Sequence, residues 1–226
     1  MFGPALVVGP ALTEWATGQR EVVDEALGLR TALEDPSLMD SEPNLFPFQR
    51  VGVRFLETVG RALIADDMGS GKTIQLIRAV ERLGPEAWPV LVVCPNSMKY
   101  TWKEEIEKWS HLTPVVIDGT AVQRKKAIAT EANVYIINWE SLRLHSRLSG
   151  YGSINLTDAE KVPKELNGIE WGTVIADEAH RAKDARSKQT RALWQVSRGA
   201  KHRFAATGTP IESNPSELWP IMNFIS

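Results

Sequence analysis

Short runs rich in apolar residues alternate along the chain with longer helix-like runs. The short runs predict strands at residues 62–65, 90–94, 114–117, 133–137, 173–176 and 202–206. The run at 90–94 is continuously apolar, as in a strand buried on both faces. The longer runs predict helices at residues 48–56, 73–80, 97–109, 121–130, 139–148, 188–196 and 216–225. This alternation indicates an α/β fold with a mainly parallel, doubly wound sheet and helices on both of its faces.

The first 44 residues give weaker signals than the rest. A helix capped by Thr13 and running towards Leu33 is predicted, although Gly18 and Gly28 reduce its propensity. Turn-forming residues follow at 35–37 and 41–44. We therefore interpret residues 1–44 as an accessory extension and residues 45–226 as one domain, with a polar surface insertion at 150–167.

Composition limits the classes of protein that fit. The 226 residues carry a net charge of −2, so a nucleic-acid partner would need a local basic face. The lone Cys94 lies in an apolar run and reads as a small buried hydrophobe, which suits a reducing compartment. No apolar run approaches the roughly 20 residues of a membrane span, and the N-terminus lacks a basic signal-peptide start. We expect a cytosolic protein that does not enter a membrane.

A glycine-rich stretch at residues 65–73 (ADDMGSGKT) follows a predicted strand and opens a predicted helix. This is the context of a phosphate-binding loop, formed here by Met68, Gly69, Ser70, Gly71, Lys72 and Thr73. The helix start offers N–H groups to an anion, the lysine adds a point charge, and the threonine hydroxyl can bind Mg²⁺. The strict template has Gly where Asp66 stands, and a glycine turn with a chance Lys-Thr pair is the alternative.

Two acids, Asp177 and Glu178, directly follow the apolar run at 173–176. At a strand end beside a phosphate loop, the first can hold Mg²⁺ and the second can activate water. A solvated acidic loop is the alternative. Further along, hydroxyls of Thr207 and Thr209 flank Gly208, where they can bond the segment that reaches His180; an ordinary Gly-Pro turn explains the same residues.

Two further contacts are predicted outside these loops. The amide of Gln49 can read an adenine edge through one donor and one acceptor, although a surface glutamine fits equally well. Ser97 and Lys99 stand at a helix start that suits a nucleic-acid phosphate, whereas most other basic residues read as solvated helix faces. The eight Trp residues read as packing residues.

All the predicted loops fall at the carboxyl ends of predicted strands, where parallel sheets bind their ligands. The segments also resemble, in order, the motifs of the Swi/Snf-related ATPases of helicase superfamily two. The matching segments are residues 45–52 (Q motif), 65–73 (motif I), 93–109 (Ia), 137–142 (Ib), 177–183 (II, DEAH type) and 207–219 (III). Together they cover about residues 45–226 and identify the first RecA-like lobe.

This resemblance implies an ATP hydrolase that moves on duplex or branched DNA. It assigns adenine to Gln49, phosphates and Mg²⁺ to residues 68–73, the metal to Asp177, water activation to Glu178, and coupling to His180, Thr207 and Thr209. The bacterial, phage and annealing-helicase-like branch looks most similar; a eukaryotic relative would be nuclear. The arginine finger of the second RecA-like lobe is not among these motifs, so we expect weak hydrolysis by this lobe alone. A non-catalytic regulatory lobe and a superfamily-two RNA helicase remain alternatives.

Overall fold

The computed structural model describes residues 21, 24, 28, 42, 44–210 and 213–226. The helix expected from Thr13 towards Leu33 lies almost entirely outside the described residues, as do residues 211 and 212 of the motif III segment. The chain divides into two compact units, residues 1–59 and residues 60–226. The boundary expected before residue 45 stays a prediction.

Helix α3 (Pro47–Val59) is the element of the first unit whose bounds the structure describes. It begins at a proline, whose fixed φ suits the first helical position. Its buried residues, Gln49, Val53 and Leu56, are four and three positions apart and therefore share one face. The helix is longer than the predicted 48–56 at its C-terminal end.

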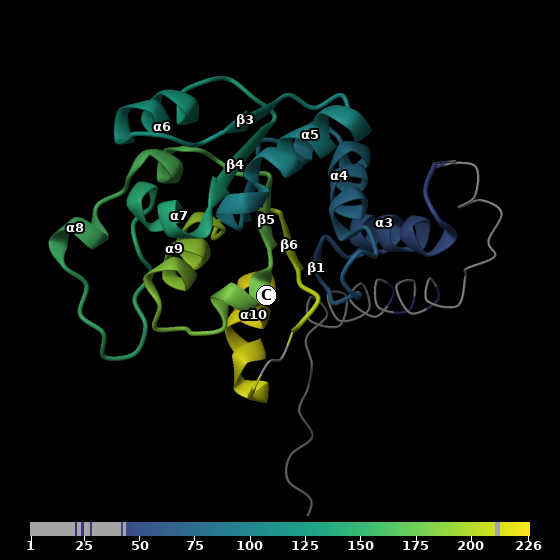
Figure 1. The fold of residues 1–226 in the computed structure, drawn as a ribbon. Helices are drawn as coiled ribbons and strands as arrows, with labels where there is room; N and C mark the ends of the chain where they lie inside the picture. The colour runs from purple at the N-terminus through teal and green to yellow at the C-terminus, as the bar shows by residue number, and fades with distance from the viewer. Residues whose placement is uncertain (1–20, 22–23, 25–27, 29–41, 43, 211–212) are drawn as a thin grey trace, which may run out of the picture. The chain divides into compact units, whose positions relative to one another are not determined.

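The second unit is built on six parallel strands in the order β1-β6-β5-β2-β4-β3 (Figure 1). Their bounds are β1 (Arg61–Ile64), β2 (Val90–Cys94), β3 (Pro114–Val116), β4 (Val134–Asn138), β5 (Thr173–Asp177) and β6 (His202–Ala206). Each lies within one residue of its predicted range. Every residue of β2, β4 and β5 is buried, as expected for central strands of a parallel sheet. The predicted α/β class with a parallel sheet is confirmed.

Helices connect the strands at nearly the predicted places. They are α4 (Lys72–Leu83), α5 (Lys99–Trp109), α6 (Ala121–Ile128), α7 (Trp139–His145), α8 (Asp158–Lys161), α9 (Lys188–Val196) and α10 (Leu218–Ile225). The helix predicted to start at Ser97 begins instead at Lys99, because a 3-10 turn at Asn96–Met98 precedes α5. The predicted insertion contains α8, which opens with a capping box between Thr157 and Glu160, and a turn that buries Leu166.

Side chains of the central strands alternate between two helical layers. Leu91 and Val93 of β2 join a core cluster with residues of α7, α9 and α10. Val90 and Val92 instead line an apolar space with Ile77 of α4 and residues of α5. Since neighbouring strand residues point to opposite faces, α4 and α5 cover one face and α7, α9 and α10 the other (Figure 1).

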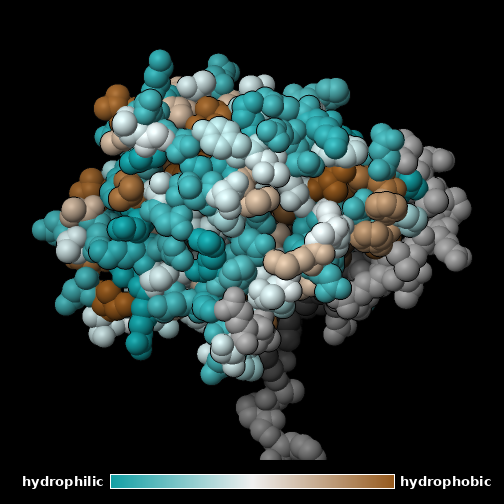
Figure 2. Space-filling view, viewed as in Figure 1, coloured by the Kyte–Doolittle hydropathy of each residue, from teal (hydrophilic) through white to brown (hydrophobic). Residues whose placement is uncertain are grey.

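The face drawn in Figure 2 is mainly hydrophilic, with apolar side chains in small groups. Cys94 has no exposed surface, which confirms its predicted place in the core. None of the helices in the described part of the chain is long and apolar enough to cross a membrane.

Candidate functional site

Three adjacent strands end at the same level of the sheet. Ile64, the last residue of β1, is paired with Ala206 of β6, and Ala206 is paired in turn with Asp177 of β5. Neighbouring strands are about 4.8 Å apart, so β1 and β5 end roughly 10 Å from each other. The loops that follow these strands therefore leave the sheet side by side, with the β6 loop in the middle.

The loop after β1 has the backbone of a tight glycine turn. Gly69 and Gly71 have φ values of 80° and 77°, which other residues rarely adopt. Helix α4 begins at Lys72, one residue earlier than predicted. The Lys72 ammonium donates hydrogen bonds to the carbonyl oxygens of Asp66 and Asp67 at 2.8 and 2.9 Å, which holds its charge over the loop.

The acid pair after β5 combines a buried carboxylate with a strained turn. Asp177 is 9% exposed, and its Oδ1 accepts a hydrogen bond from the Glu178 backbone N–H at 3.0 Å. Among the residues that the structure describes, Glu178 is the one non-glycine residue with a positive φ, 49°. This left-handed conformation costs roughly 1–2 kcal/mol for a residue with a side chain. The turn puts the second carboxylate beside the next residues of the loop, at ion-pair distance from His180.

His180 connects the acid loop to the loop after β6. Its Nδ1 lies 3.1 Å from the Thr207 hydroxyl oxygen and 3.2 Å from Glu178 Oε2. The same Thr207 oxygen accepts a hydrogen bond from the backbone N–H of Thr209 at 3.1 Å. Thr207 has no exposed surface, and its own N–H donates to the Ile64 carbonyl at the end of β1. The three residues predicted to couple the loops thus lie in one hydrogen-bonded group.

Gly208 lies directly against the loop after β1. A Cβ at this position would be 3.0 Å from Met68 Cγ and 3.9 Å from the Asp66 carbonyl oxygen. The distance to Met68 Cγ is tighter than an ordinary van der Waals contact, so a side chain at residue 208 would require Met68 to move. The middle loop therefore contacts both of its neighbours, through Gly208 on one side and Thr207 on the other.

Electrostatics also connect Lys72 with Asp177. Burial raises the pKa of the Asp177 carboxyl above its usual range, and the nearby Glu178 charge raises it further. A hydrogen bond from Trp102 and the positive charge of Lys72 act in the opposite direction. A buried acid that also feels the loop lysine is a suitable oxygen ligand for a divalent cation, which would relieve the cost of its charge.

The segment at residues 137–142, which resembles motif Ib, is tied to the acid loop. Arg181 Nη1 lies 3.0 Å from Glu140 Oε1, and Asn138 Nδ2 donates to Glu140 Oε2 at 2.8 Å. Asn138 ends β4 and Glu140 lies in the first turn of α7. These pairs connect two segments that were predicted only as separate motifs.

The predicted nucleic-acid contact at Lys99 needs correction. Its side chain is 2% exposed and its ammonium pairs with Asp118 Oδ1 at 2.8 Å, so it is not a surface charge. Hydrogen bonds from Lys99, from the Gly119 backbone and from Tyr100 hold the pKa of Asp118 below its usual range. Ser97 is exposed, and its contact with nucleic acid stays a prediction.

The expected adenine reader lies in the other unit. Gln49 is 7% exposed, and its amide oxygen accepts a hydrogen bond from the Phe46 backbone N–H at 3.0 Å. This bond fixes the amide in the first turn of α3. Its reading of adenine stays a prediction.

A tryptophan that the sequence did not single out contacts the acid. Trp102 Nε1 donates a hydrogen bond to Asp177 Oδ2 at 2.8 Å, across 75 positions of sequence. Its place in the motif Ia segment was the available signal, but the pattern there predicts only a packing residue. The Asp177 carboxylate therefore has a neutral donor beside it as well as the charges of Lys72 and Glu178.

The groups gathered at this edge suit a nucleotide phosphate with Mg²⁺. The α4 amino end and Lys72 offer positive charge, and Thr73 is the second residue of that helix. Asp177 offers a carboxylate that burial makes costly to leave charged without a cation. Gly69 has open space at its Cβ position, so the main chain there can be approached closely.

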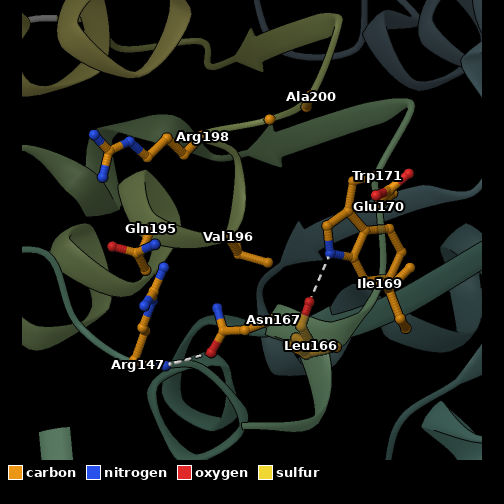
Figure 3. Close-up of a pocket in the computed structure, with 11 residues that line it drawn as sticks. Arg147, Leu166, Asn167, Ile169, Glu170, Trp171, Gln195, Val196, Arg198 and Ala200 are labelled. Atoms are coloured by element: carbon orange, nitrogen blue, oxygen red, sulfur yellow. Dashed lines mark hydrogen bonds between the residues drawn. The ribbon is translucent and has the colours of Figure 1, made fainter. Parts of the chain in front are cut away.

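A separate pocket of about 470 Å³ lies at the opposite edge of the sheet (Figure 3). It is lined by residues that precede β5 and β6, including Trp171 and Ala200, and by Arg147, Asn167 and Gln195. Arg147 and Gln195 point towards each other, and with its amide turned Gln195 accepts from Arg147 at 3.0 Å. Because this pocket is at the amino ends of the strands, it is distinct from the site described above.

Comparisons with known proteins all find SNF2-related proteins. The model of the SNF2-related domain matches residues 48–226. The chain is 36% identical over 177 residues to the bovine DNA annealing helicase and endonuclease ZRANB3, covering 77% of this chain and 15% of that protein. It is 34% identical over 204 residues to the Arabidopsis thaliana protein CHROMATIN REMODELING 19, covering 82% and 25%.

A solved structure agrees with these sequence matches. The Sulfolobus solfataricus SWI2/SNF2 ATPase core in complex with dsDNA has a TM-score of 0.64 and 29% identity, covering 80% of this chain and 36% of that chain. The chain thus spans a quarter or less of the two curated relatives named above. These relatives come from animals and a plant and the structure from an archaeon, so the expected bacterial or phage branch finds no support in them.

Proposed function

This chain belongs to the SNF2-related family, and from that premise we propose that residues 45–226 form an ATP·Mg²⁺-binding motor lobe of a DNA-dependent ATPase. The observation that carries the proposal is the convergence of three loops at one sheet edge. Gly208 lies against Met68, and the Thr207 hydroxyl lies 3.1 Å from His180. That arrangement joins a phosphate loop to an acid pair through a third loop able to respond to both.

Each group has a defined task in this proposal. The first N–H groups of α4 and the Lys72 ammonium bind the phosphates, with Gly69 and Gly71 keeping the main chain open to them. The Thr73 hydroxyl and the Asp177 carboxylate hold Mg²⁺. When bound, Mg²⁺ neutralises charge that develops on the transferred phosphoryl oxygens.

The Glu178 carboxylate orients the attacking water and accepts its proton. The left-handed turn at Glu178 leaves its carboxylate 3.2 Å from His180 Nδ1, while the neighbouring Asp177 is buried. His180 and Thr207 then transmit a change at the acid loop to Thr209. Hydrolysis by this lobe alone is expected to be slow, because an arginine finger in related NTPases is worth about 10³–10⁵ in rate.

Duplex DNA is the nucleic acid that the comparisons favour as a partner. One relative's name describes a DNA annealing helicase, and the similar solved structure is a complex with dsDNA. We extend both to this chain as the proposed substrate, and propose that a second RecA-like lobe completes the motor. A role on chromatin like that named for the plant relative would place the protein in the nucleus.

Binding of a fluorescent ATP analogue with Mg²⁺ tests the proposal. Lys72→Ala should lower the affinity at least tenfold, because it removes the charge at the phosphates. Lys201→Ala is the matched control, since this exposed lysine pairs with Glu86 at 2.8 Å near the opposite sheet edge. Equal affinities for the wild type and Lys72→Ala would exclude a phosphate loop here.

Turnover distinguishes the catalytic proposal from a binding-only lobe. Glu178→Gln should bind the analogue as the wild type does but lose the residual ATP hydrolysis. Duplex DNA should stimulate hydrolysis more than RNA of the same length. Stimulation by RNA alone would favour an RNA helicase. Binding without turnover even after a second RecA-like lobe and DNA are added would favour a regulatory lobe.

A further inference from the structure

Trp102 is locked between the helix of the phosphate loop and the acid strand. It lies in α5 and is 1% exposed. With Ile77 and Val80 of α4 and Ile175 of β5, it lines an apolar void of about 10 Å³. A ring packed so closely among three elements has little freedom to rotate.

The polar end of this ring is directed at Asp177. The indole N–H donates to Oδ2 at 2.8 Å, while the Glu178 backbone N–H donates to Oδ1 at 3.0 Å. Each carboxylate oxygen thus has one neutral donor. Neutral donors fix the orientation of the carboxylate without cancelling the charge that would attract a cation.

A second tryptophan holds the backbone of the same residue. Trp139, at the start of α7, has no exposed surface, and its indole donates to the Asp177 carbonyl oxygen at 3.0 Å. Helices α5 and α7 cover opposite faces of the sheet. The acid is therefore fixed from both sides at the point where β5 ends.

We propose that Trp102 is a positioning residue for Mg²⁺, whose indole N–H sets the orientation in which the Asp177 carboxylate receives the metal. The inference rests on the proposed function, because Mg²⁺ is expected here only with a nucleotide. Groups that hold a metal-binding carboxylate typically contribute about 10–100-fold to metal affinity. Trp102 therefore acts on the metal through Asp177 and touches neither metal nor nucleotide itself.

The test titrates Mg²⁺ into the 226-residue chain at a fixed concentration of a fluorescent ATP analogue. Trp102→Phe keeps an aromatic ring but removes the donor, and should raise the half-saturating Mg²⁺ concentration about 10–100-fold. Its affinity for the analogue in EDTA should stay near that of the wild type. This separates a metal effect from a general loss of the phosphate site.

Trp171→Phe is the matched control. Trp171 is 4% exposed and donates its indole N–H to the Leu166 carbonyl at 3.0 Å, before β5 begins. The Trp171→Phe variant also loses an indole N–H donor, but at the opposite end of the sheet. Its Mg²⁺ titration should equal that of the wild type. A titration of Trp102→Phe equal to the wild type, or equal shifts in both variants, would overturn the inference. Absence of analogue binding by the wild type would instead overturn the proposed function.

A measurement on the wild type covers the case in which Trp102→Phe does not fold. The indole N–H resonances are recorded by NMR with ¹⁵N-labelled protein, and Trp102 is assigned from its ring contacts with Ile77 and Val80. Adding Mg²⁺ to the nucleotide-bound protein should move the Trp102 resonance and leave that of Trp171 in place. An unmoved Trp102 resonance would refute the role.

Discussion

Replacing Thr207 by valine tests whether the middle loop is bonded to the acid loop. The side chain has no exposed surface, and valine keeps nearly its volume while removing the hydroxyl. Two hydrogen bonds disappear, one with His180 and one from Thr209, both 3.1 Å long. A typical bond contributes about 0.5–1.5 kcal/mol, and water can reach both partners in part, so we expect a loss of about 1–2 kcal/mol in the free energy of unfolding.

A double-mutant cycle with His180→Ala separates the Thr207–His180 hydrogen bond from the total loss of unfolding free energy. Urea denaturation of the two single variants and the double variant should give an interaction energy of about 0.5–1.5 kcal/mol. Thr173→Val is the matched control: that buried hydroxyl donates to the Ala87 carbonyl at 2.9 Å, four residues before Asp177 on β5. Paired with His180→Ala it should be additive within about 0.5 kcal/mol. Additivity in the Thr207 cycle as well would refute the coupling.

Three further predictions concern the rest of the core. Gly172→Ala should destabilise the protein by more than 2 kcal/mol or prevent folding in urea experiments, because a Cβ would lie 2.5 Å from a backbone carbon; Gly168→Ala, with open space, should not. Cys94 should react with a thiol reagent only on unfolding, because burial raises the pKa of its thiol. Burial lowers the pKa values of His145 and His202, so protonation favours the unfolded chain and the free energy of unfolding should fall from pH 7 to below 6.5; a flat pH profile would contradict this.

The central strands β2, β4 and β5 could be predicted because burial of every residue leaves a largely apolar run. The C-terminal end of α7 could not be predicted, because residues 146–148 continue the helical pattern. The structure ends the helix at His145, whose ring is held by Arg124 and Glu165, and the backbone of Arg147 bonds instead to Asn167. Contacts about 20 residues away therefore decided a boundary that local pattern left open.

A contact distant in sequence also explains why Lys99 is buried and not exposed as predicted. A serine and a lysine at a helix start predict a phosphate contact, but sequence spacing does not show which way the lysine points. Asp118, after β3, supplies an ion-pair partner 2.8 Å away and the side chain becomes buried. The loops expected after three strands do follow β1, β5 and β6. The sequence could not identify a donor such as Trp102, which reaches Asp177 only in the folded chain.

The strand order places the loop after β6 between the loops that follow β1 and β5. Because β6 lies between β1 and β5, Thr207 and Gly208 leave the sheet between the lysine loop and the acid loop. Gly208 has no side chain at the point where Met68 approaches, and Thr207 has a hydroxyl at the point where His180 approaches. A displacement of either outer loop must therefore move or break a contact of the middle one. The Thr209 backbone N–H bonds to the same Thr207 hydroxyl, so a contact change at either outer loop also bears on residue 209.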